Sequence, residues 1–288
     1  PSGSPGGEHG YGGYADTLQL LNLTGNDFSP TGPSAHFLEG LALSVNLRTL
    51  NLSCCSLGDR GAKRLLEVLS QRDSKDQMAC HLEDLDVSNN NLTQASARLL
   101  PNLFGQNLGL RTLRMQANDL GEEGAPFVAE AIHVGKGRLE RLYVSQNLFR
   151  VNGARAILHA FVAPVMIKVQ IHRQPGQTAG LTLDNHLKIL GVTPASVMDS
   201  WNSDNPADEV MTGDFVVRVN DKTDPAELAE ALNSETDLEV VFHRPGAEMK
   251  FLDVSDNRIG LAGVTELRDE IGRKTEGTMT GNVMRWHT

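Results

Sequence analysis

The sequence predicts an α/β repeat solenoid, with parallel strands on its concave face and helices on its convex face, interrupted by a small second domain. Two observations lead to this fold class. A leucine-lined pattern recurs along the chain at a nearly constant spacing. The spacing is broken once, before the last occurrence, by a stretch with a different sequence pattern.

The repeating pattern is L-x-x-L-x-L-x-x-N-x-L. Its six occurrences begin at Leu18, Leu47, Leu82, Leu110, Leu139 and Met249. The L-x-L core predicts a short strand whose leucines point inward, because side chains alternate between the two faces of a strand. The asparagine stands where the chain leaves the strand, so its amide can satisfy buried backbone groups there. In the second repeat Cys55 takes this position.

A helix is predicted after each turn, because apolar residues follow at i, i+3 and i+4 spacing, as in Leu65, Leu66 and Leu69. Three of these segments carry a small pair near their start: Gly61-Ala62, Gly124-Ala125 and Gly153-Ala154. We expect these pairs to let helix and strand backbones approach each other closely.

The first four intervals between repeat starts are close to one period, whereas the fifth, from Leu139 to Met249, is almost four times as long. This last interval is one period plus about 81 residues, which locates an insertion. The predicted organisation is a Gly-rich leader at 1–14, five repeats at 15–164, the insert at 165–246, a sixth repeat at 247–272 and a tail at 273–288. We expect a disordered tail, with Trp286 either capping the sixth repeat or reaching a neighbouring subunit.

A period of 28–29 residues with one helix per repeat resembles the ribonuclease-inhibitor class of leucine-rich repeats. The resemblance covers roughly residues 15–164 and 247–272. It implies a solenoid whose repeats bury their apolar edges by stacking on one another. It implies a fold and leaves the function open, because one fold serves many functions.

The insert carries GLTL at 180–183, GDFVVRVND at 213–221, and then a helix signal in which Asp224 is the expected N-cap and Pro225 the first helical residue. This order resembles a PDZ domain. The resemblance implies a small, partly open β-barrel that adds a peptide strand to a sheet edge and holds a C-terminal carboxylate on loop amides. It places the peptide-binding loop at Gly180, Leu181, Thr182 and Leu183. Thr182 stands where the family has its second loop glycine.

Composition excludes several classes of function. The net charge of −10 argues against a nucleic-acid partner, which needs a basic surface. No apolar run reaches the length of a membrane span. The three cysteines, Cys54, Cys55 and Cys80, form neither a disulfide framework nor a CxxC zinc motif. They favour a reducing intracellular compartment, cytoplasmic or organellar after loss of a targeting peptide.

The sequence contains no G-x-S-x-G, phosphate-loop or H-E-x-x-H motif, and its nine histidines are scattered. We therefore expect no enzyme activity, no cofactor and no metal. The expected partner surface is the outward side of the strands, where exposed arginine and aromatic side chains are favoured binding anchors. The candidates are Arg114, Arg141, Tyr143 and Phe251.

Two functions remain open on the sequence. The leading hypothesis is a non-enzymatic scaffold or structural subunit of a larger assembly, which binds protein partners through the repeat surface and the insert. The alternative is a regulatory effector, resembling the repeat proteins that activate GTPases or inhibit hydrolases. An effector of the first kind needs an exposed arginine on a rim loop, and Arg150 is the candidate for this role.

Overall fold

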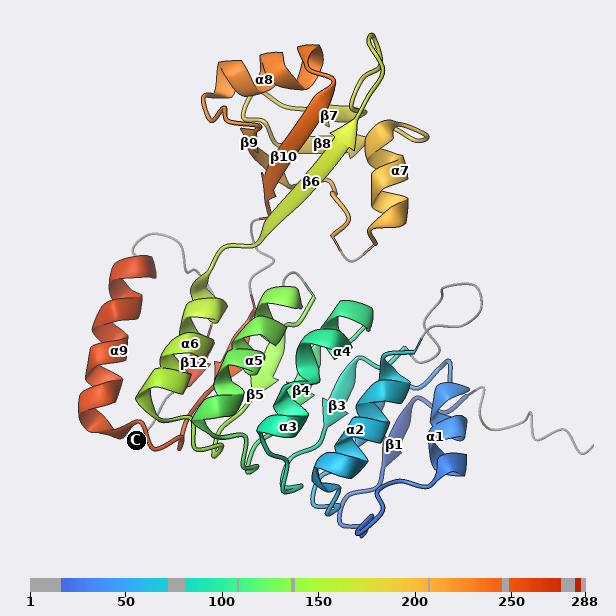
Figure 1. Ribbon diagram of the computed structural model, residues 1–288, viewed down its shortest axis with the longest axis vertical. Coiled ribbons are helices and arrows are strands. Elements are labelled where there is room, and N and C mark those ends of the chain that lie inside the picture. The colour runs from blue at the N-terminus through green and yellow to red at the C-terminus, as the bar shows by residue number, and fades with distance from the viewer. Residues whose placement is uncertain are drawn as a thin grey trace, which may run out of the picture. The chain divides into compact units, whose positions relative to one another are not determined.

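Two compact units make up the chain (Figure 1). The computed structural model describes residues 17–71, 81–107, 109–135, 138–206, 208–244, 249–275 and 283–285. The repeat unit consists of Pro1–Val162 and Met249–Thr288, and the inserted unit of Ala163–Glu248. The limits of the inserted unit differ by two residues at each end from the predicted 165–246. The predicted leader at 1–14 lies outside the described residues.

Strands and helices alternate along the repeat unit. Its elements are β1 (Leu20–Asn22), α1 (Ala35–Ala42), β2 (Thr49–Asn51), α2 (Gly58–Leu69), β3 (Asp84–Asp86), α3 (Gln94–Ala97), α4 (Leu100–Gln106), β4 (Thr112–Arg114), α5 (Gly121–Val134), β5 (Arg141–Tyr143), α6 (Arg150–Val162), β11 (Phe251–Asp253), α9 (Gly260–Thr275) and β12 (Val283–Arg285). Each strand is three residues long, as an L-x-L core predicts.

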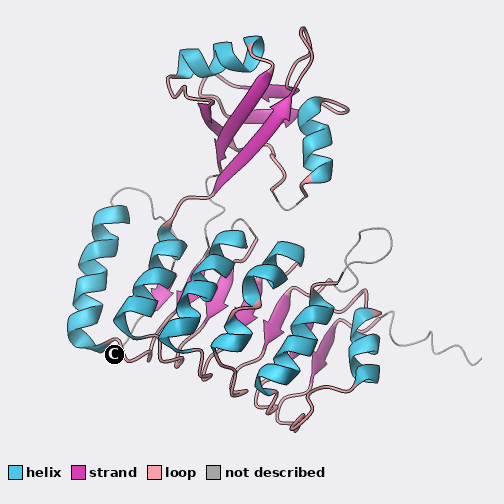
Figure 2. Cartoon of the chain, viewed as in Figure 1, coloured by secondary structure: helices cyan, strands magenta, loops and turns pink. Residues whose placement is uncertain are grey.

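The strands form one parallel sheet in the order β1-β2-β3-β4-β5-β11-β12, and the helices cover one side of it (Figure 2). β11 lies beside β5, with Leu252 opposite Leu142. The repeat pattern therefore resumes in space after the insertion, and the prediction of a repeat solenoid is confirmed.

The end of the chain differs from the disordered tail that the sequence predicted. Helix α9 runs to Thr275, and β12 pairs in parallel with β11, with Val283 opposite Phe251. The open edge of β11 would present unpaired backbone N–H and C=O groups, and an additional strand satisfies them. For residues 273–275 and 283–285 the prediction was wrong, because this segment lacks the leucine pattern by which the other strands were predicted. Trp286 lies outside the described residues.

The inner side chains of the strands and helices form one continuous core. The central residues of five successive strands are at most 2% exposed: Leu50, Leu85, Leu113, Leu142 and Leu252. The first repeat differs because it stands at the end of the stack: Leu21, the central residue of β1 and the register partner of Leu50, is only half-buried. The apolar edges of these repeats are thus buried by their neighbours, as stacking requires.

Buried asparagines connect successive repeats at the turn after each strand. At most 6% of the surface is exposed in each of four of them: Asn90, Asn118, Asn147 and Asn257. The Nδ2 atom of Asn147 donates to the Met115 carbonyl of the preceding repeat at 2.9 Å and to the Val144 carbonyl at 3.1 Å. In the second repeat the Sγ atom of Cys55 donates to the Leu23 carbonyl at 3.1 Å, and burial raises the pKa of this thiol.

Small residues in the helices allow close packing between neighbouring helices, whereas the sequence predicted close packing between helix and strand. A Cβ atom added at Gly153 of α6 would lie 2.8 Å from the Cβ atom of Ala125 in α5. One added at Gly263 of α9 would lie 2.5 Å from Cγ2 of Val151 in α6. The prediction named the wrong neighbour, because each helix belongs to one repeat and these glycines lie on the flank that meets the helix of the preceding repeat.

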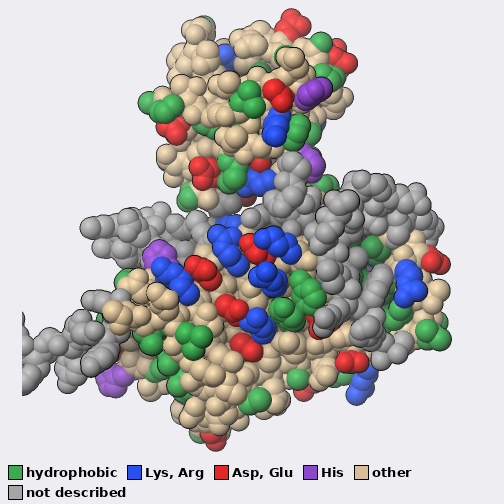
Figure 3. All heavy atoms as spheres, turned by 180° about the vertical axis from the view of Figure 1, so that it is seen from behind, with side chains coloured by type: hydrophobic (Ala, Val, Ile, Leu, Met, Phe, Trp, Pro, Cys, Tyr) green, Lys and Arg blue, Asp and Glu red, His purple; other side chains and the backbone are tan. Residues whose placement is uncertain are grey.

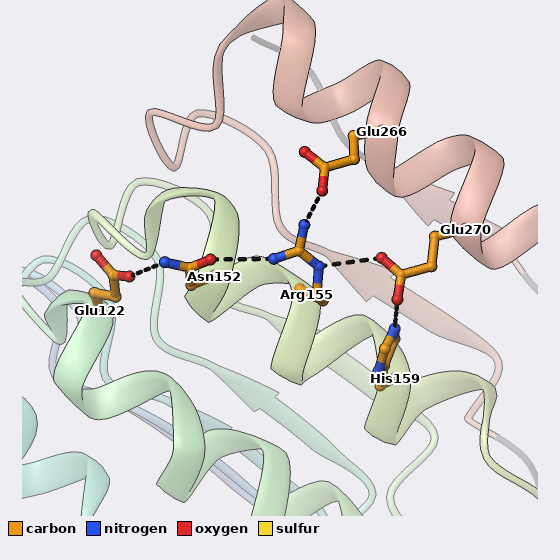
Figure 4. Close-up of polar contacts among 6 residues, drawn as sticks. All are labelled: Glu122, Asn152, Arg155, His159, Glu266 and Glu270. Atoms are coloured by element: carbon orange, nitrogen blue, oxygen red, sulfur yellow. Dashed lines mark hydrogen bonds and ion pairs between the residues drawn. The ribbon is translucent and has the colours of Figure 1, made fainter.

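A polar network joins α6 to α9 across the insertion (Figure 4). Arg155 of α6 pairs with Glu266 and donates from Nε to Glu270 at 3.1 Å. The Nε2 atom of His159 lies 2.7 Å from Glu270. Helix α6 precedes the inserted unit in the sequence and α9 follows it. The network therefore adds polar contacts to the apolar packing between these two helices.

The inserted unit has its own elements and its own core. Its elements are β6 (Met166–His172), β7 (Leu181–Leu183), β8 (Ile189–Val192), α7 (Val197–Asp204), β9 (Phe215–Val219), α8 (Pro225–Ser234) and β10 (Asp237–His243). Strands β6, β10 and β9 form one antiparallel sheet, and β7 pairs with β8 in another. Asp224 caps α8 by accepting from the Ala226 N–H at 3.0 Å, and Pro225 begins the helix, as predicted.

Across the described ranges, none of the helices has both the length and the apolar character needed to cross a membrane.

Candidate functional site

The outward side chains of the strands make up the sheet face of the repeat unit. Figure 3 shows Lys and Arg side chains grouped with Asp and Glu side chains on the side away from the helices. The four predicted contact residues lie on three adjacent strands: Arg114 on β4, Arg141 and Tyr143 on β5, and Phe251 on β11. Not every outward position is open, because Thr112 is only 5% exposed between its register partners Asp84 and Arg141.

Tyr143 lies in the middle of a group that we call the arginine–aromatic row: Arg114, Tyr143 and Phe251. The ring centroids of Tyr143 and Phe251 are 4.8 Å apart, with an interplanar angle of 37°. The guanidinium carbon of Arg114 is 5.1 Å from the centroid of the Tyr143 ring, and Arg114 also pairs with Asp84. Tilted ring pairs and a cation over a ring face are favourable arrangements. The row is therefore held in place before any partner arrives.

Three cations surround the Glu140 carboxylate, which stands just before β5. The Nζ atom of Lys250 is 2.9 Å from it, and guanidinium nitrogens of Arg111 and Arg141 are each 3.7 Å away. We call these four residues the Glu140 cluster. The hydrogen bond from Lys250 holds the pKa of Glu140 below its ordinary value, although burial opposes this. The separation between each guanidinium group and the carboxylate is too long for a hydrogen bond, so both arginines interact with Glu140 through charge alone.

Of this cluster only Arg141 was predicted as a contact residue from the sequence; Arg111, Glu140 and Lys250 were not. A signal was present. The residue after the first apolar position of the pattern is charged in five successive repeats, with alternating sign: Arg48, Glu83, Arg111, Glu140 and Lys250. Because equal positions of successive repeats stack side by side, these charges lie next to one another in the structure. Arg48 and Glu83, for example, are 3.4 Å apart.

A groove with a volume of about 340 Å³ lies between β7 and α8 of the inserted unit. Gly180, Leu181 and Leu183 line it, whereas Thr182 is exposed and does not. Gly180 has a φ of +87°, and a Cβ atom there would lie 2.1 Å from the Oγ atom of Ser196, so this position requires glycine. Strand β7 pairs with β8 on one edge, and no other strand in the described ranges pairs with it.

A second hollow, of about 780 Å³, lies where the strands of the repeat unit lead into the helices. Arg150 and Arg258 line it from successive repeats, together with Glu122 and Glu123. Arg150 begins α6 and is exposed. The hollow thus contains both cations and carboxylates.

Cys54 is exposed and Cys55 is buried, and both are free thiols. Cys80 lies outside the described residues. Where the structure describes the chain, no three His, Cys, Asp or Glu side chains are grouped in a way that could hold a metal ion.

Comparison with known proteins bears on the repeat unit. A family model described as "Leucine Rich repeat" matches residues 44–66, 79–100 and 249–267. The chain is 32% identical to "NACHT, LRR and PYD domains-containing protein 3" of Homo sapiens over 49% of this chain and 13% of that protein. It is 34% identical to "Ribonuclease inhibitor" of Sus scrofa over 44% of this chain and 26% of that protein.

A third similar protein is "RAN GTPase-activating protein 2" of Arabidopsis thaliana, with 27% identity over 41% of this chain and 20% of that protein. The matched part of the chain thus spans about a quarter or less of the length of these three relatives. The sheet, the repeat pattern and these matches agree with one another. The repeat unit is therefore a stack of leucine-rich repeats.

Proposed function

We propose that this chain is a non-enzymatic protein-interaction module, a scaffold or structural subunit of a larger assembly, and that the sheet face binds a partner protein. The arginine–aromatic row carries the proposal. A few side chains supply most of the binding energy in protein interfaces, and tyrosine and arginine are enriched among them. Here the rings are 4.8 Å apart, and the arginine is 5.1 Å from the Tyr143 ring. Because these side chains are already ordered, little conformational entropy is lost when a partner binds.

Replacing both rings, Tyr143→Ala with Phe251→Ala, tests this function. We expect at least about a tenfold loss of the partner retained by the chain, measured by affinity capture from a lysate of the source organism and quantitative mass spectrometry. The control is Leu43→Ala with Leu261→Ala, which removes two side chains that are 73% and 75% exposed outside the sheet. Equal retention by the ring variant and the control would contradict the proposal.

We further propose that the inserted unit is PDZ-like and binds an extended peptide in the groove beside β7. The unpaired edge of β7 offers backbone N–H and C=O groups to an added strand. Leu181 and Leu183 line the groove next to this edge, and alternate side chains of an added strand would point toward them. Gly180, directly before β7, brings the loop close to Ser196, the N-cap of α7.

Ala229 lies in α8 and lines the same groove, so Ala229→Trp should fill it. Peptides selected by phage display for a free C-terminus serve as probes, with fluorescence anisotropy as the measurement. We expect Ala229→Trp to abolish binding and Ala226→Trp, at an exposed position outside the groove, to leave it unchanged. Amidating the peptide should weaken binding by about tenfold or more, since charged hydrogen bonds are strong. Unchanged peptide binding by Ala229→Trp would contradict the proposal that the peptide binds in this groove.

A regulatory effector, either GTPase activator-like or hydrolase inhibitor-like, is the second candidate function. It is favoured by the hollow that Arg150 and Arg258 line and by the similarity to a protein named as a GTPase activator. If it is right, the chain stimulates GTP hydrolysis by at least one member of a panel of small GTPases. Arg150→Ala should remove the stimulation and Arg60→Ala, on an exposed helix position, should not. If the intact chain stimulates none of these GTPases, the GTPase activator-like function is rejected.

A further inference from the structure

We infer that the Glu140 cluster is a docking site for an acidic segment of the partner protein, in which carboxylates flank an aromatic or aliphatic side chain. This inference rests on the proposed binding role of the sheet face and adds the chemistry of the partner. It starts from a charge imbalance: one carboxylate, Glu140, stands among three cations, Arg111, Arg141 and Lys250.

The exposure of these groups shows which charges a partner would meet. The side chains of Arg111 and Arg141 are 51% and 47% exposed, and that of Lys250 is 56% exposed, whereas the side chain of Glu140 is only 25% exposed. Glu140 makes its short contact with Lys250, and the two arginines remain 3.7 Å away. Among the described residues neither guanidinium group has a hydrogen-bond acceptor. Both therefore keep a planar set of N–H donors that matches a carboxylate.

The cluster is continuous with the arginine–aromatic row. Arg141 is the register partner of Phe251 on β11. It also stands two residues before Tyr143 on β5, and residues two apart lie on the same face of a strand. A bound segment thus meets guanidinium donors and aromatic rings side by side. This combination selects a peptide with both carboxylates and an apolar side chain.

The rest of the molecule disfavours a long phosphate polymer at this site. The whole chain has a net charge of −10, and Asp84, Asp86 and Asp253 stand at outward positions of the same sheet. A nucleic acid gains its affinity from many phosphate contacts along a basic track. A short acidic segment needs only the two or three cations that are present here, and the surrounding negative charge repels a longer polyanion.

The experiment uses the intact chain and a fluorescein-labelled peptide with glutamates on both sides of a tryptophan, with anisotropy measured at an ionic strength of about 0.1 M, where the Debye length is about 10 Å. The comparison probes carry glutamine for glutamate, or alanine for tryptophan. The test variant is Arg111→Gln with Arg141→Gln. The control is Arg60→Gln with Arg268→Gln, which makes the same change in net charge at exposed helix positions of α2 and α9.

We expect the test variant and the glutamine peptide each to weaken binding by about tenfold or more, because charge-assisted contacts are lost. The control should stay within about twofold, since charges far from the site are screened by salt. Glu140→Gln should tighten binding, because it removes the carboxylate that competes with the peptide for Arg111 and Arg141. Losses of equal size in the test and control variants would overturn the inference, as would equal binding of the glutamate and glutamine peptides or no binding of either.

A single-stranded oligonucleotide of similar charge provides a further comparison, and tighter binding of this probe than of the peptide would also overturn the inference. Partner capture separates the inference from the proposed function. If the ring variant loses the partner while Arg111→Gln with Arg141→Gln retains it, the sheet face still binds a partner and the acidic segment is rejected.

Discussion

Asn147 shows at the scale of one residue how two repeats are held together. Its side chain is fully buried. Its Nδ2 atom donates to carbonyls on both sides of the repeat boundary, those of Met115 and Val144, while its Oδ1 atom accepts from the Leu120 N–H at 3.4 Å. Water cannot reach these backbone groups. Without the hydrogen bonds of the Asn147 amide, their burial would cost free energy.

Asn147→Ala should lower the free energy of unfolding by about 1–3 kcal/mol, because a buried N–H loses its acceptor and the carbonyls lose a donor. Urea denaturation followed by circular dichroism measures the change. Asn152→Ala is the control in the same segment, where an exposed amide donates to Glu122 and accepts from Arg155, and its effect should stay within about 0.5 kcal/mol. Equal effects of the two substitutions would show that the buried Asn147 amide contributes no more to stability than an ordinary surface contact.

Gly153 shows how a single residue sets the distance between the helices of two repeats. Gly153→Ala should destabilise the fold by about 1–3 kcal/mol, because the new Cβ atom would lie 2.8 Å from that of Ala125 and force α5 and α6 apart. Gly40→Ala, in the middle of α1 where a Cβ atom meets nothing within 4 Å, should instead stabilise it by up to about 1 kcal/mol. Thermal unfolding of both variants measures whether their stabilities change in opposite directions. A Gly153→Ala protein as stable as the unmodified chain would contradict the close approach of α5 and α6.

At the scale of elements, helix α9 must dock on α6 although the insertion separates them in sequence. Apolar residues of both helices belong to one core, and Gly263 lets the two backbones approach. The Glu270 carboxylate adds polar contacts with Arg155 and His159 on α6. Apolar packing and the polar contacts thus act together at this helix pair, and the polar contacts favour one register of it.

The network predicts a pH dependence. The hydrogen bond from Arg155, followed by that from His159, lowers the pKa of Glu270 from its ordinary 4.5. A carboxyl group whose pKa is lowered by folding stabilises the fold above the unfolded value, and this contribution is lost as the pH falls through the folded value. We therefore expect the stability difference between the unmodified chain and Glu270→Gln to shrink as the pH falls below about 4.5. Urea titrations over this range measure the difference.

Glu130→Gln is the control for this titration, because Glu130 is exposed on α5. It should leave the pH dependence unchanged. A difference between the unmodified chain and Glu270→Gln that stays constant from neutral to acid pH would contradict the role of the Glu270 carboxylate.

At the scale of the whole molecule, the inserted unit interrupts the repeats without taking part in their core. The two units have separate apolar clusters. Between α5 and β5 the chain needs only residues 135–140, whereas between α6 and β11 it runs from 163 to 250. A connection of ordinary length is therefore sufficient for the repeat unit.

Replacing residues 163–248 with a Gly-Ser linker of about four residues restores that ordinary spacing before β11. We expect the shortened repeat unit to fold, because its core loses no side chain. Hydrogen exchange should show protected amides in β5 and β11, as in the full chain. Loss of protection in β11 alone would mean that the insert, and not the stacking of repeats, positions the last repeat.

The leucine spacing alone determines the repeat, the strand–turn–helix order and the place of the insertion. It can do so because periodicity encodes which side of an element is buried, and this is a local property. The same reasoning correctly placed Arg114, Arg141, Tyr143 and Phe251 on the sheet, since equal positions of successive repeats stack. The long interval before Met249 did not hide the sixth repeat, because a repeat is recognised by its own pattern.

Only the tertiary structure decided which side chains meet. The periodic charges indicate that Arg111, Glu140 and Lys250 are neighbours, but only the structure shows that Glu140 makes its short contact with Lys250 and that Arg111 stays 3.7 Å away. The pairing of β12 and the contact of Gly153 with α5 are likewise absent from any local pattern. Such contacts depend on how long side chains and neighbouring backbones are arranged in space, and periodicity carries no information about that arrangement.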